Sequence, residues 1–470
     1  MTDLELAYRA LTDKKHYYDL LFDYYEGDQP LIYSAERLRE IFKDFDARFT
    51  QNWCAVVVDS CLERIQLRGY TVAKNQGIAK ALGKLVEANE LTLEADSVHL
   101  AALVTGEAFV IVDEDEEEGP QAYYNDPRNC HAFYYANNPR KMRFAAKWWL
   151  GDDNRRYLNL YYEDRVEYYV TKEATLDAGN VQSADAFQSA DPDVADNPNG
   201  VIPVFHFRRD RRKVQSELKN VLEPQNAINK LLNDMMIAAE FGAFPQRWAI
   251  TETDIKNLKN APNEIWRLFP SEEGAQNTQL GEFSATQLDN YITGIDKYST
   301  AIAIITRTPK HYFFVQGGDP SGEALIALEA PLNKKCQKYI DRFAVTWRAL
   351  ANYMLTLQGA TVDPLTVAAT FDRPETVQPK TESDIRAQDV KSGIPLTTTL
   401  RDAGWTDADI KAMEEDRANE QKAQQTNLAA ALLNAQSNFD QGDTNNGSNN
   451  GTDSQITGNG NGNNNERVPA

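Results

Sequence analysis

Cysteine and long apolar runs are both scarce in this sequence. The four cysteines, Cys54, Cys61, Cys130 and Cys336, are spread over 470 residues, which is too few and too scattered for a disulfide framework. No apolar run approaches the ~18 residues that a membrane span needs, and the first ten residues lack the basic and apolar regions of a signal peptide. We therefore expect a soluble protein of a reducing compartment with no membrane segment.

Basic charge is also in short supply. The chain carries 49 Lys and Arg against 70 Asp and Glu, which gives a formal net charge of -21. A protein that grips nucleic acid neutralises phosphates with clustered Lys and Arg, so this balance argues against a DNA clamp. An electronegative wall repels phosphates, however, and the charge is therefore compatible with a surface along which DNA slides.

Local patterns for catalysis are absent as well. The histidines are isolated, and the sequence contains no HExxH pattern, nucleophile elbow or GxxxxGK[ST] loop. The five are His16, His99, His131, His206 and His311. His16, His99, His131 and His206 are interpreted as packing or surface residues. We predict no catalytic residue and no cofactor, and any ATP-driven motor would be a separate protein.

Two groupings might suggest a metal site. The acidic run at residues 113–118 lies between two predicted strands and ends at Gly119 and Pro120, which is typical of a solvated turn; the alternative is a carboxylate cluster that binds a metal. Cys54 and Cys61 share one helix face, but no further ligand lies beside them at zinc-finger spacing. We interpret them as buried structural residues, so no metal site is predicted.

The N-terminal half contains helices followed by strands. From Ala108 the chain changes to short aromatic and β-branched segments separated by turns, typical of a mainly antiparallel sheet. Pro203 indicates that residues 201–207 form an edge strand or contain a strand start. A boundary is predicted near residue 212. The helices that the apolar spacing predicts before the sheet lie at residues 4–25, 52–67 and 91–106.

Long helices dominate the next region. The first is predicted between residues 216 and 241, with Pro224 in its first turn or at a kink, and the second over residues 286–306. Short strands at residues 247–250 and 265–269 form a small insert between them. The apolar seam predicted for the second helix consists of Leu288, Tyr291, Ile295, Tyr298, Ile302 and Ile305.

A third helix is predicted over residues 321–357, with a kink at Pro331. The loop before it, residues 307–320, contains glycines, and Asp319 with Pro320 is predicted as its N-cap and N1 pair. The segments after it are a strand at residues 366–371, helices near residues 383–391, 398–403 and 407–436, and a polar tail at residues 441–465 that cannot order itself.

Five blocks, in this order, resemble the siphophage portal family, in particular its SPP-one-like branch. No single block is diagnostic, and their joint order carries the resemblance, which covers residues 10–420. The blocks are DYYEGDQPL (23–31), NWCAVVVDSCLERIQLRGY (52–70), NPNGVIPVFHF (197–207), LEPQNAINKLLNDMM (222–236) and TRTPKHYFFVQGGDPSGEAL (306–325).

The resemblance implies an α+β, portal-type subunit with an α/β wing, a two-helix stem, a small β-containing clip, a kinked tunnel helix and a helical crown. The implied segments are a wing at 1–212, a first stem helix at 213–243, a clip at 244–284, a second stem helix at 285–308, a tunnel loop at 309–320, the kinked helix at 321–358, a wing return strand at 359–378, the crown at 379–437 and a disordered tail at 438–470.

Two sets of residues are candidates for lining a DNA channel. In the loop, Lys310 and His311 would touch phosphate transiently and the glycines would permit movement, although an ordinary exposed loop is an equal alternative. On the second stem helix a polar stripe would let DNA slide, the alternative being a solvated helix face. The loop set is Lys310, His311, Gln316, Gly317, Gly318 and Asp319, and the stem set is Asp289, Thr293, Asp296 and Thr300.

The resemblance further implies a homo-oligomeric ring of about twelve subunits at one capsid vertex of the virion, assembled in the cytoplasm of the bacterial host. Double-stranded DNA would pass through it without sequence-specific binding. The implied partners are the terminase large subunit, the major capsid and scaffolding proteins, and head-completion or adaptor proteins. Two rival hypotheses are another oligomeric phage head or connector protein, and a phage nuclease or transferase with strand-end carboxylates.

Overall fold

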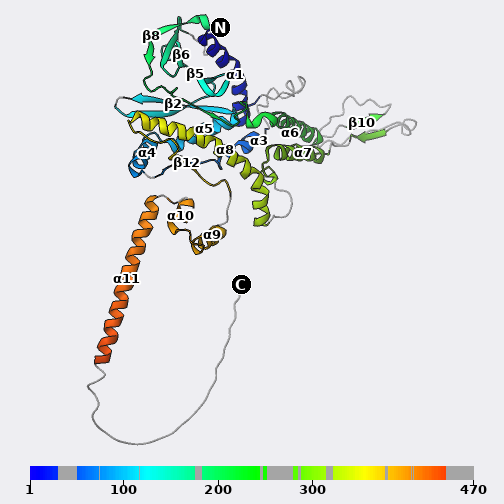
Figure 1. Cartoon of the computed structure of the whole chain (residues 1–470). Helices are drawn as coiled ribbons and strands as arrows, with labels where there is room; N and C mark the ends of the chain where they lie inside the picture. Colours follow the sequence, from blue (N-terminus) through cyan, green and yellow to red (C-terminus); the bar gives the residue numbers. More distant parts are fainter. Residues whose placement is uncertain are drawn as a thin grey trace. The chain divides into compact units, whose positions relative to one another are not determined.

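The computed structural model of the chain describes residues 1–29, 50–73, 75–115, 117–174, 183–243, 247–250, 279–283, 287–313, 321–375, 379–403, 405 and 407–440. It divides into two compact units, Met1–Val377 and Gln378–Ala470. The described residues form a mixed helix-and-sheet fold, which is compatible with the predicted α+β class (Figure 1).

Helix α1 (Asp3–Glu26) opens the first unit, and its ends follow from its sequence. The Thr2 hydroxyl accepts a hydrogen bond from the backbone N–H of Glu5, whose carboxylate accepts one from the Thr2 N–H. This capping box satisfies two backbone donors that a helix start leaves unpaired. Gly27 ends the helix in the left-handed conformation, at φ 88°, which glycine adopts without steric cost.

The described residues of the first unit form six further helices. They are α3 (Trp53–Leu62), α4 (Gln76–Ala88), α5 (Leu91–Val104), α6 (Leu222–Ala243), α7 (Asp289–Thr306) and α8 (Gly322–Leu357). Short 3-10 turns lie at η1 (Ala184–Ala186), η2 (Glu217–Asn220) and η4 (Lys310–Tyr312). Helix α8 continues through Pro331, and Figure 1 shows it bending along its length.

All strand pairs in the described residues are antiparallel, as predicted. One sheet has the order β3 (Gly119–Asn125), β2 (Glu107–Asp115), β9 (Val204–Arg208). The second has the order β4 (Cys130–Tyr135), β5 (Asn138–Leu150), β6 (Arg156–Tyr161), β7 (Arg165–Thr171), β8 (Phe187–Asp196). Two-stranded pairs join β1 (Leu67–Val72) to β12 (Val367–Phe371) and β10 (Arg247–Ile250) to β11 (Gln279–Glu282).

The largest core lies where α3, α5 and α8 meet the β2 sheet. Trp347 and Phe343 of α8 are fully buried there, against Phe207 of β9. A second core packs α1 against one face of the five-stranded sheet, with Leu11 beside Phe144. A third fills the space between the two larger sheets.

Strand β12 lies far along the chain but pairs with β1, so the chain returns to the N-terminal part of the same unit.

The second unit contains α9 (Pro379–Lys391), α10 (Leu396–Asp402) and α11 (Asp407–Asp440). Leu400 and Ile410 are buried within it. All three helices were predicted, with α11 several residues longer than expected. The tail predicted to be disordered, residues 438–470, lies outside the described residues from residue 441 onward.

Two details of the predicted elements need correction, and a third lies outside the described residues. Helix α8 begins at Gly322 with Ser321 as its N-cap, because the Ser321 hydroxyl accepts from the N–H of Ala324 at 3.3 Å; Asp319 and Pro320, predicted for that role, lie outside the described residues. Strands β1, β8 and β11 and helix α4 were not predicted, and the helix predicted over residues 52–67 ends earlier, at Leu62. The second predicted insert strand, residues 265–269, falls outside the described residues, and β10 pairs with β11.

The seam predicted on α7 is only partly buried. Ile295 and Ile302 are buried, whereas Leu288, Tyr298 and Ile305 are 37%, 42% and 51% exposed. A straight helix rotates ~20° per heptad relative to a strict seven-residue repeat, so one line of positions cannot stay against the core. The residues of α7 that are buried are Ile295, Ser299, Ile302, Ala303 and Thr306.

Candidate channel segment

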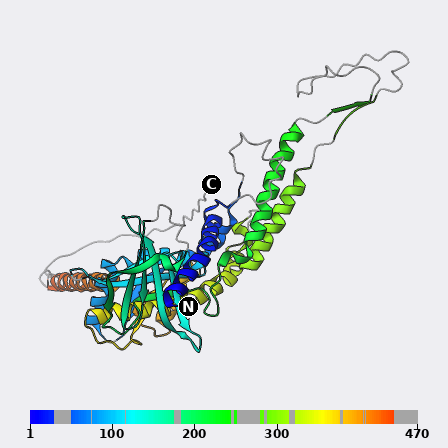
Figure 2. The ribbon, with the colours of Figure 1, turned by 90° about the horizontal axis from the view of Figure 1, so that it is seen from above.

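Helices α6 and α7 lie side by side and extend from the body of the first unit (Figure 2). A Cβ atom on Gly294 of α7 would lie only 3.0 Å from Leu231 of α6, so the glycine permits their close approach. The first turns of α6 are tied to the body: the Gln225 side chain accepts from the backbone N–H of Trp53 at 3.0 Å, and Tyr24 donates to Asn226 at 2.7 Å. Pro224 lies in the first turn, one of its two predicted places.

The polar stripe of α7 lies outside the buried face. Asp289 and Thr293 are exposed, and Asp296 and Thr300 are half-buried. None of the four contributes to the apolar core around Ile295. The stripe is therefore accessible along part of the helix.

The chain leaves α7 through Arg307, in the left-handed conformation at φ 61°. It then turns back, so that Lys310 reaches the stripe and its ammonium lies 3.2 Å from a carboxylate oxygen of Asp296. The structure thus joins one predicted loop residue to one predicted stem residue. His311 is half-buried and its ring packs edge-on against Tyr312, 4.7 Å between ring centres.

Tyr312 fastens this turn to two helices. Arg64, just beyond α3, donates to its hydroxyl at 2.6 Å, and that hydroxyl donates to Glu329 of α8 at 3.1 Å. Arg64 and Glu329 also form an ion pair at 3.4 Å. Burial raises the pKa of Tyr312, so the phenol keeps its proton. Phe313 adds an edge-on contact with Trp53, 5.4 Å between ring centres.

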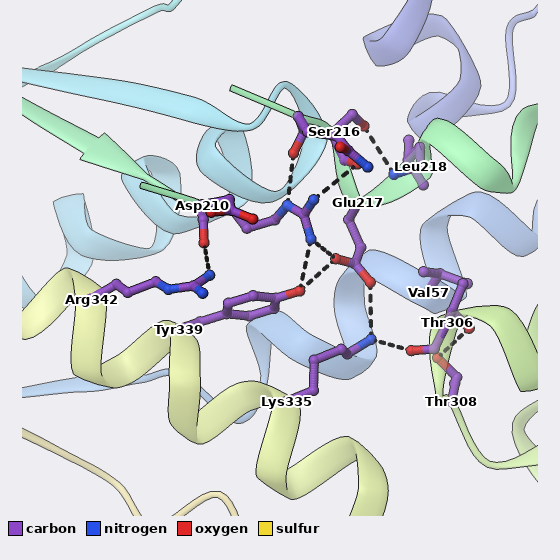
Figure 3. Close-up of polar contacts among 12 residues, drawn as sticks. Val57, Asp210, Ser216, Glu217, Leu218, Thr306, Thr308, Lys335, Tyr339 and Arg342 are labelled. Carbon is purple, nitrogen blue, oxygen red and sulfur yellow. Dashed lines mark hydrogen bonds and ion pairs between the residues drawn. The ribbon is translucent and has the colours of Figure 1, made fainter. Parts of the chain in front are cut away.

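A buried ion cluster lies beneath the end of α7 (Figure 3). One carboxylate oxygen of Glu217 is 3.0 Å from the Lys335 ammonium; the other is 2.8 Å from the Arg209 guanidinium and accepts a hydrogen bond from the Tyr339 hydroxyl at 2.7 Å. Lys335 also donates to the Thr306 carbonyl, in the last turn of α7, at 2.5 Å. The cluster therefore links η2, the end of α7 and α8.

Charge balance keeps the cluster ionised. Burial alone would raise the pKa of Glu217, but Lys335 and Arg209 outweigh it and hold that pKa below its usual value. Burial alone would lower the pKa of Lys335, but its interactions with Cys61 and Glu217 outweigh burial and raise that pKa. All four cysteines are buried and free; burial was predicted for Cys54 and Cys61.

A second buried carboxylate, Glu107 of β2, is likewise satisfied. One carboxylate oxygen of Glu107 is 3.1 Å from the Lys14 ammonium and accepts a hydrogen bond from the Tyr18 hydroxyl at 2.8 Å. The other is 2.9 Å from Nε2 of His206. His99 accepts a hydrogen bond from Trp347 at 2.9 Å, and burial lowers its pKa to about 3. The Glu107 contacts hold α1 to the sheet of β2, and the His99 contact holds α8 to α5. His99 and His206 are thus packing residues, one of the two roles predicted for the histidines.

The structure places some predicted residues and not others. Gln316, Gly317, Gly318 and Asp319 lie outside the described residues, as does most of the predicted clip. Within the described part of the chain, no group of three or more His, Cys, Asp or Glu side chains is suited to a metal ion, and no helix is long and apolar enough to span a membrane. The Glu217 cluster was missed, because its members are far apart in sequence.

The first unit consists of a mixed helix-and-sheet body, a pair of long helices and a turn that is fastened to the base of that pair. The buried carboxylates Glu107 and Glu217 both have cationic partners. These features are those of a structural subunit. The family model "Phage portal protein, SPP1 Gp6-like" matches residues 7–425, and the chain belongs to this family. No curated protein matches the chain. The resemblance found in the sequence is therefore confirmed.

Membership establishes a phage portal function. The family is structural and not enzymatic. It implies an oligomeric ring with capsid and terminase partners, and a place in the virion capsid.

Proposed function

We propose that about twelve copies of this chain form a ring at the portal vertex, through which double-stranded DNA is packaged and later ejected. The ring assembles in the host cytoplasm with the major capsid and scaffolding proteins. It then docks the terminase large subunit, and afterwards head-completion or adaptor proteins. The observation that carries this proposal is the family match over residues 7–425.

Within that ring, α6 and α7 are the stem and the segment between them, residues 244–284, is the clip. Residues 309–320 are the tunnel loop, residues 1–212 with the strand of 359–378 are the wing, and residues 379–437 are the crown. The Lys310 contact with Asp296 supports this division, because it holds the start of the loop against the accessible stripe of α7.

The stripe lines the channel. Its carboxylates repel phosphate and its threonines offer only weak polar contacts, so DNA slides past it. Among the loop residues, Gln316, Gly317, Gly318 and Asp319 contact DNA alongside His311. Lys310 contributes little charge of its own, because Asp296 largely neutralises it.

A thiol-labelling experiment on assembled rings tests this arrangement. The native cysteines are buried, so Thr293→Cys introduces the accessible thiol. We expect annular particles with a central hole by negative-stain imaging, and loss of DNase-protected DNA from heads once a bulky maleimide is attached. The matched control is Leu93→Cys, 66% exposed on α5, whose labelling should leave packaging unchanged.

Two results contradict the proposal. A uniform monomer that never forms rings, even with capsid and scaffold present, overturns the portal arrangement. Rings that package normally with label at Thr293, or that cannot be labelled there, overturn the channel-facing position of the stripe.

A further inference from the structure

A short basic run interrupts this acidic chain. Five of the six residues at 208–213 are Arg or Lys, whereas the whole chain has a net charge of -21. The run starts at Arg208, the last residue of β9, and continues into the connection to η2. It lies on neither α7 nor the loop at residues 309–320.

One arginine of the run turns inward and fixes both ends of the connection. Arg209 donates to the carbonyl of Gln215 at 2.7 Å and to that of Ser216 at 3.4 Å, besides pairing with Glu217. Its own N–H donates to the carbonyl of Gly106 at 3.1 Å. A Cβ atom on Gly106 would lie 2.5 Å from the Gln215 backbone, so the two segments are in close contact. The turn is therefore preorganised.

The remaining cations of the turn face solvent. Arg211, Arg212 and Lys213 are exposed. Arg212 pairs with Asp210 at 3.1 Å while its side chain stays 85% exposed. Neither Arg211 nor Lys213 forms an ion pair with any residue that the structure describes. These two charges are consequently available to an outside anion.

Helix α8 adds positive charge beside the turn. Arg342 donates to the carbonyl of Arg209. Hydrogen bonds from Arg212, with a smaller contribution from the charge of Arg342, lower the pKa of Asp210 to about 2. Lys338, one helical turn before Arg342, is exposed on the same side of α8. The acidic groups near this surface are Asp210, which is engaged by Arg212, and Asp341, which accepts from Gln337 at 2.9 Å.

The chemistry of the surface fits a polyphosphate. Protein interfaces concentrate aromatic and apolar residues at their centre, but Val214 is the one large apolar residue exposed in the turn. Adjacent flexible cations on a fixed turn are suited to phosphates, because each neutralised phosphate releases counterions. We propose that the turn formed by Arg211, Arg212 and Lys213 binds the phosphate backbone of double-stranded DNA, outside the candidate channel residues.

A closed circular plasmid distinguishes this contact from the channel, since it cannot thread a ring. Binding of fluorescent plasmid to the full chain in its assembled form is measured over a range of NaCl concentrations. Each phosphate contact contributes about 0.9 to the slope of log K against log salt. The variant R211A/R212A/K213A should therefore bind more weakly, with a slope smaller by up to about 2.7.

The matched control removes three exposed cations elsewhere, in K80A/K84A/R140A. The proposal is sustained if only the first variant loses affinity and slope. It is overturned if the wild-type rings do not bind the plasmid, or if both variants lose affinity equally, which would indicate net charge alone. It is also overturned if the first variant binds DNA normally but forms fewer rings, because the turn would then contact a second copy of the chain.

Discussion

Glu217 is the residue on which the base of the loop depends. It is a buried carboxylate with two cationic partners, so removal of its charge leaves Lys335 and Arg209 buried without compensation. Loss of one member of such a cluster costs about 3 kcal/mol or more. We predict that Glu217→Gln lowers the free energy of unfolding by about that amount, measured as the urea midpoint by tryptophan fluorescence.

The control is Glu87→Gln, the same change at an exposed position of α4, which should shift the free energy of unfolding by less than about 0.5 kcal/mol.

The pH dependence of stability follows from the depressed pKa of Glu217. Its stabilisation is complete above the unfolded value of 4.5 and is lost as pH falls through the lower folded pKa. The difference between wild type and Glu217→Gln should shrink below pH 4.5; a constant difference would show that the charge is not responsible.

The sequence allows some of these residues to be predicted and not others. Lys310 and Asp296 were both chosen from local patterns, but their ion pair depends on the turn after Arg307, which no periodicity encodes. Glu217 gave no local signal, since Lys335 comes from a helix more than a hundred residues away. The basic run at residues 208–213 was readable in the sequence but was hidden by the net charge of the whole chain.

At the scale of elements, the turn after α7 is held mainly by one phenol. Tyr312→Phe keeps the ring but removes hydrogen bonds to Arg64 and Glu329, and a bond to a charged group contributes about 1.5–3 kcal/mol. We predict that the backbone amides of residues 310–313 exchange with deuterium about tenfold faster or more. Mass spectrometry of that peptide measures the rate.

Tyr298→Phe on α7 is the matched control, because Tyr298 is 42% exposed and has no hydrogen bond to any residue that the structure describes. Exchange in its peptide and in residues 310–313 should be unchanged. If Tyr312→Phe leaves exchange at residues 310–313 at the wild-type rate, the attachment to α3 and α8 is made by Phe313 and the Arg64 ion pair instead.

Elements with strong periodicity were predictable, and those fixed by tertiary contacts were not. Helices α6, α7 and α8 carry apolar residues at helical spacing, and β2 to β7 carry aromatic and β-branched residues between turns. Strand β8 contains Pro192 and three aspartates within Phe187–Asp196, a composition that argues against a strand. It is held in place by pairing with β7. The pairing of β1 with β12 likewise joins distant segments.

At the scale of the molecule, each copy brings a net charge of -21 to the ring. Bringing such subunits together is opposed by repulsion, which salt screens: the Debye length falls from ~10 Å at 0.1 M to ~3 Å at 1 M. We predict that the fraction of subunits in rings, at fixed protein concentration, rises between 0.05 and 0.5 M NaCl, roughly the range over which this screening grows. Sedimentation velocity measures it.

The direction of this response separates two kinds of subunit interface. An interface closed by apolar contacts becomes more stable as salt screens the charges, because the hydrophobic contribution persists while the repulsion between subunits weakens. Rings that dissociate as NaCl rises would instead require exposed ion pairs between subunits, and the cations at Arg211, Arg212 and Lys213 would be the first candidates. The variant R211A/R212A/K213A decides between them: it should assemble no worse than wild type if these residues are reserved for DNA, and worse at low salt if they bind a neighbouring copy.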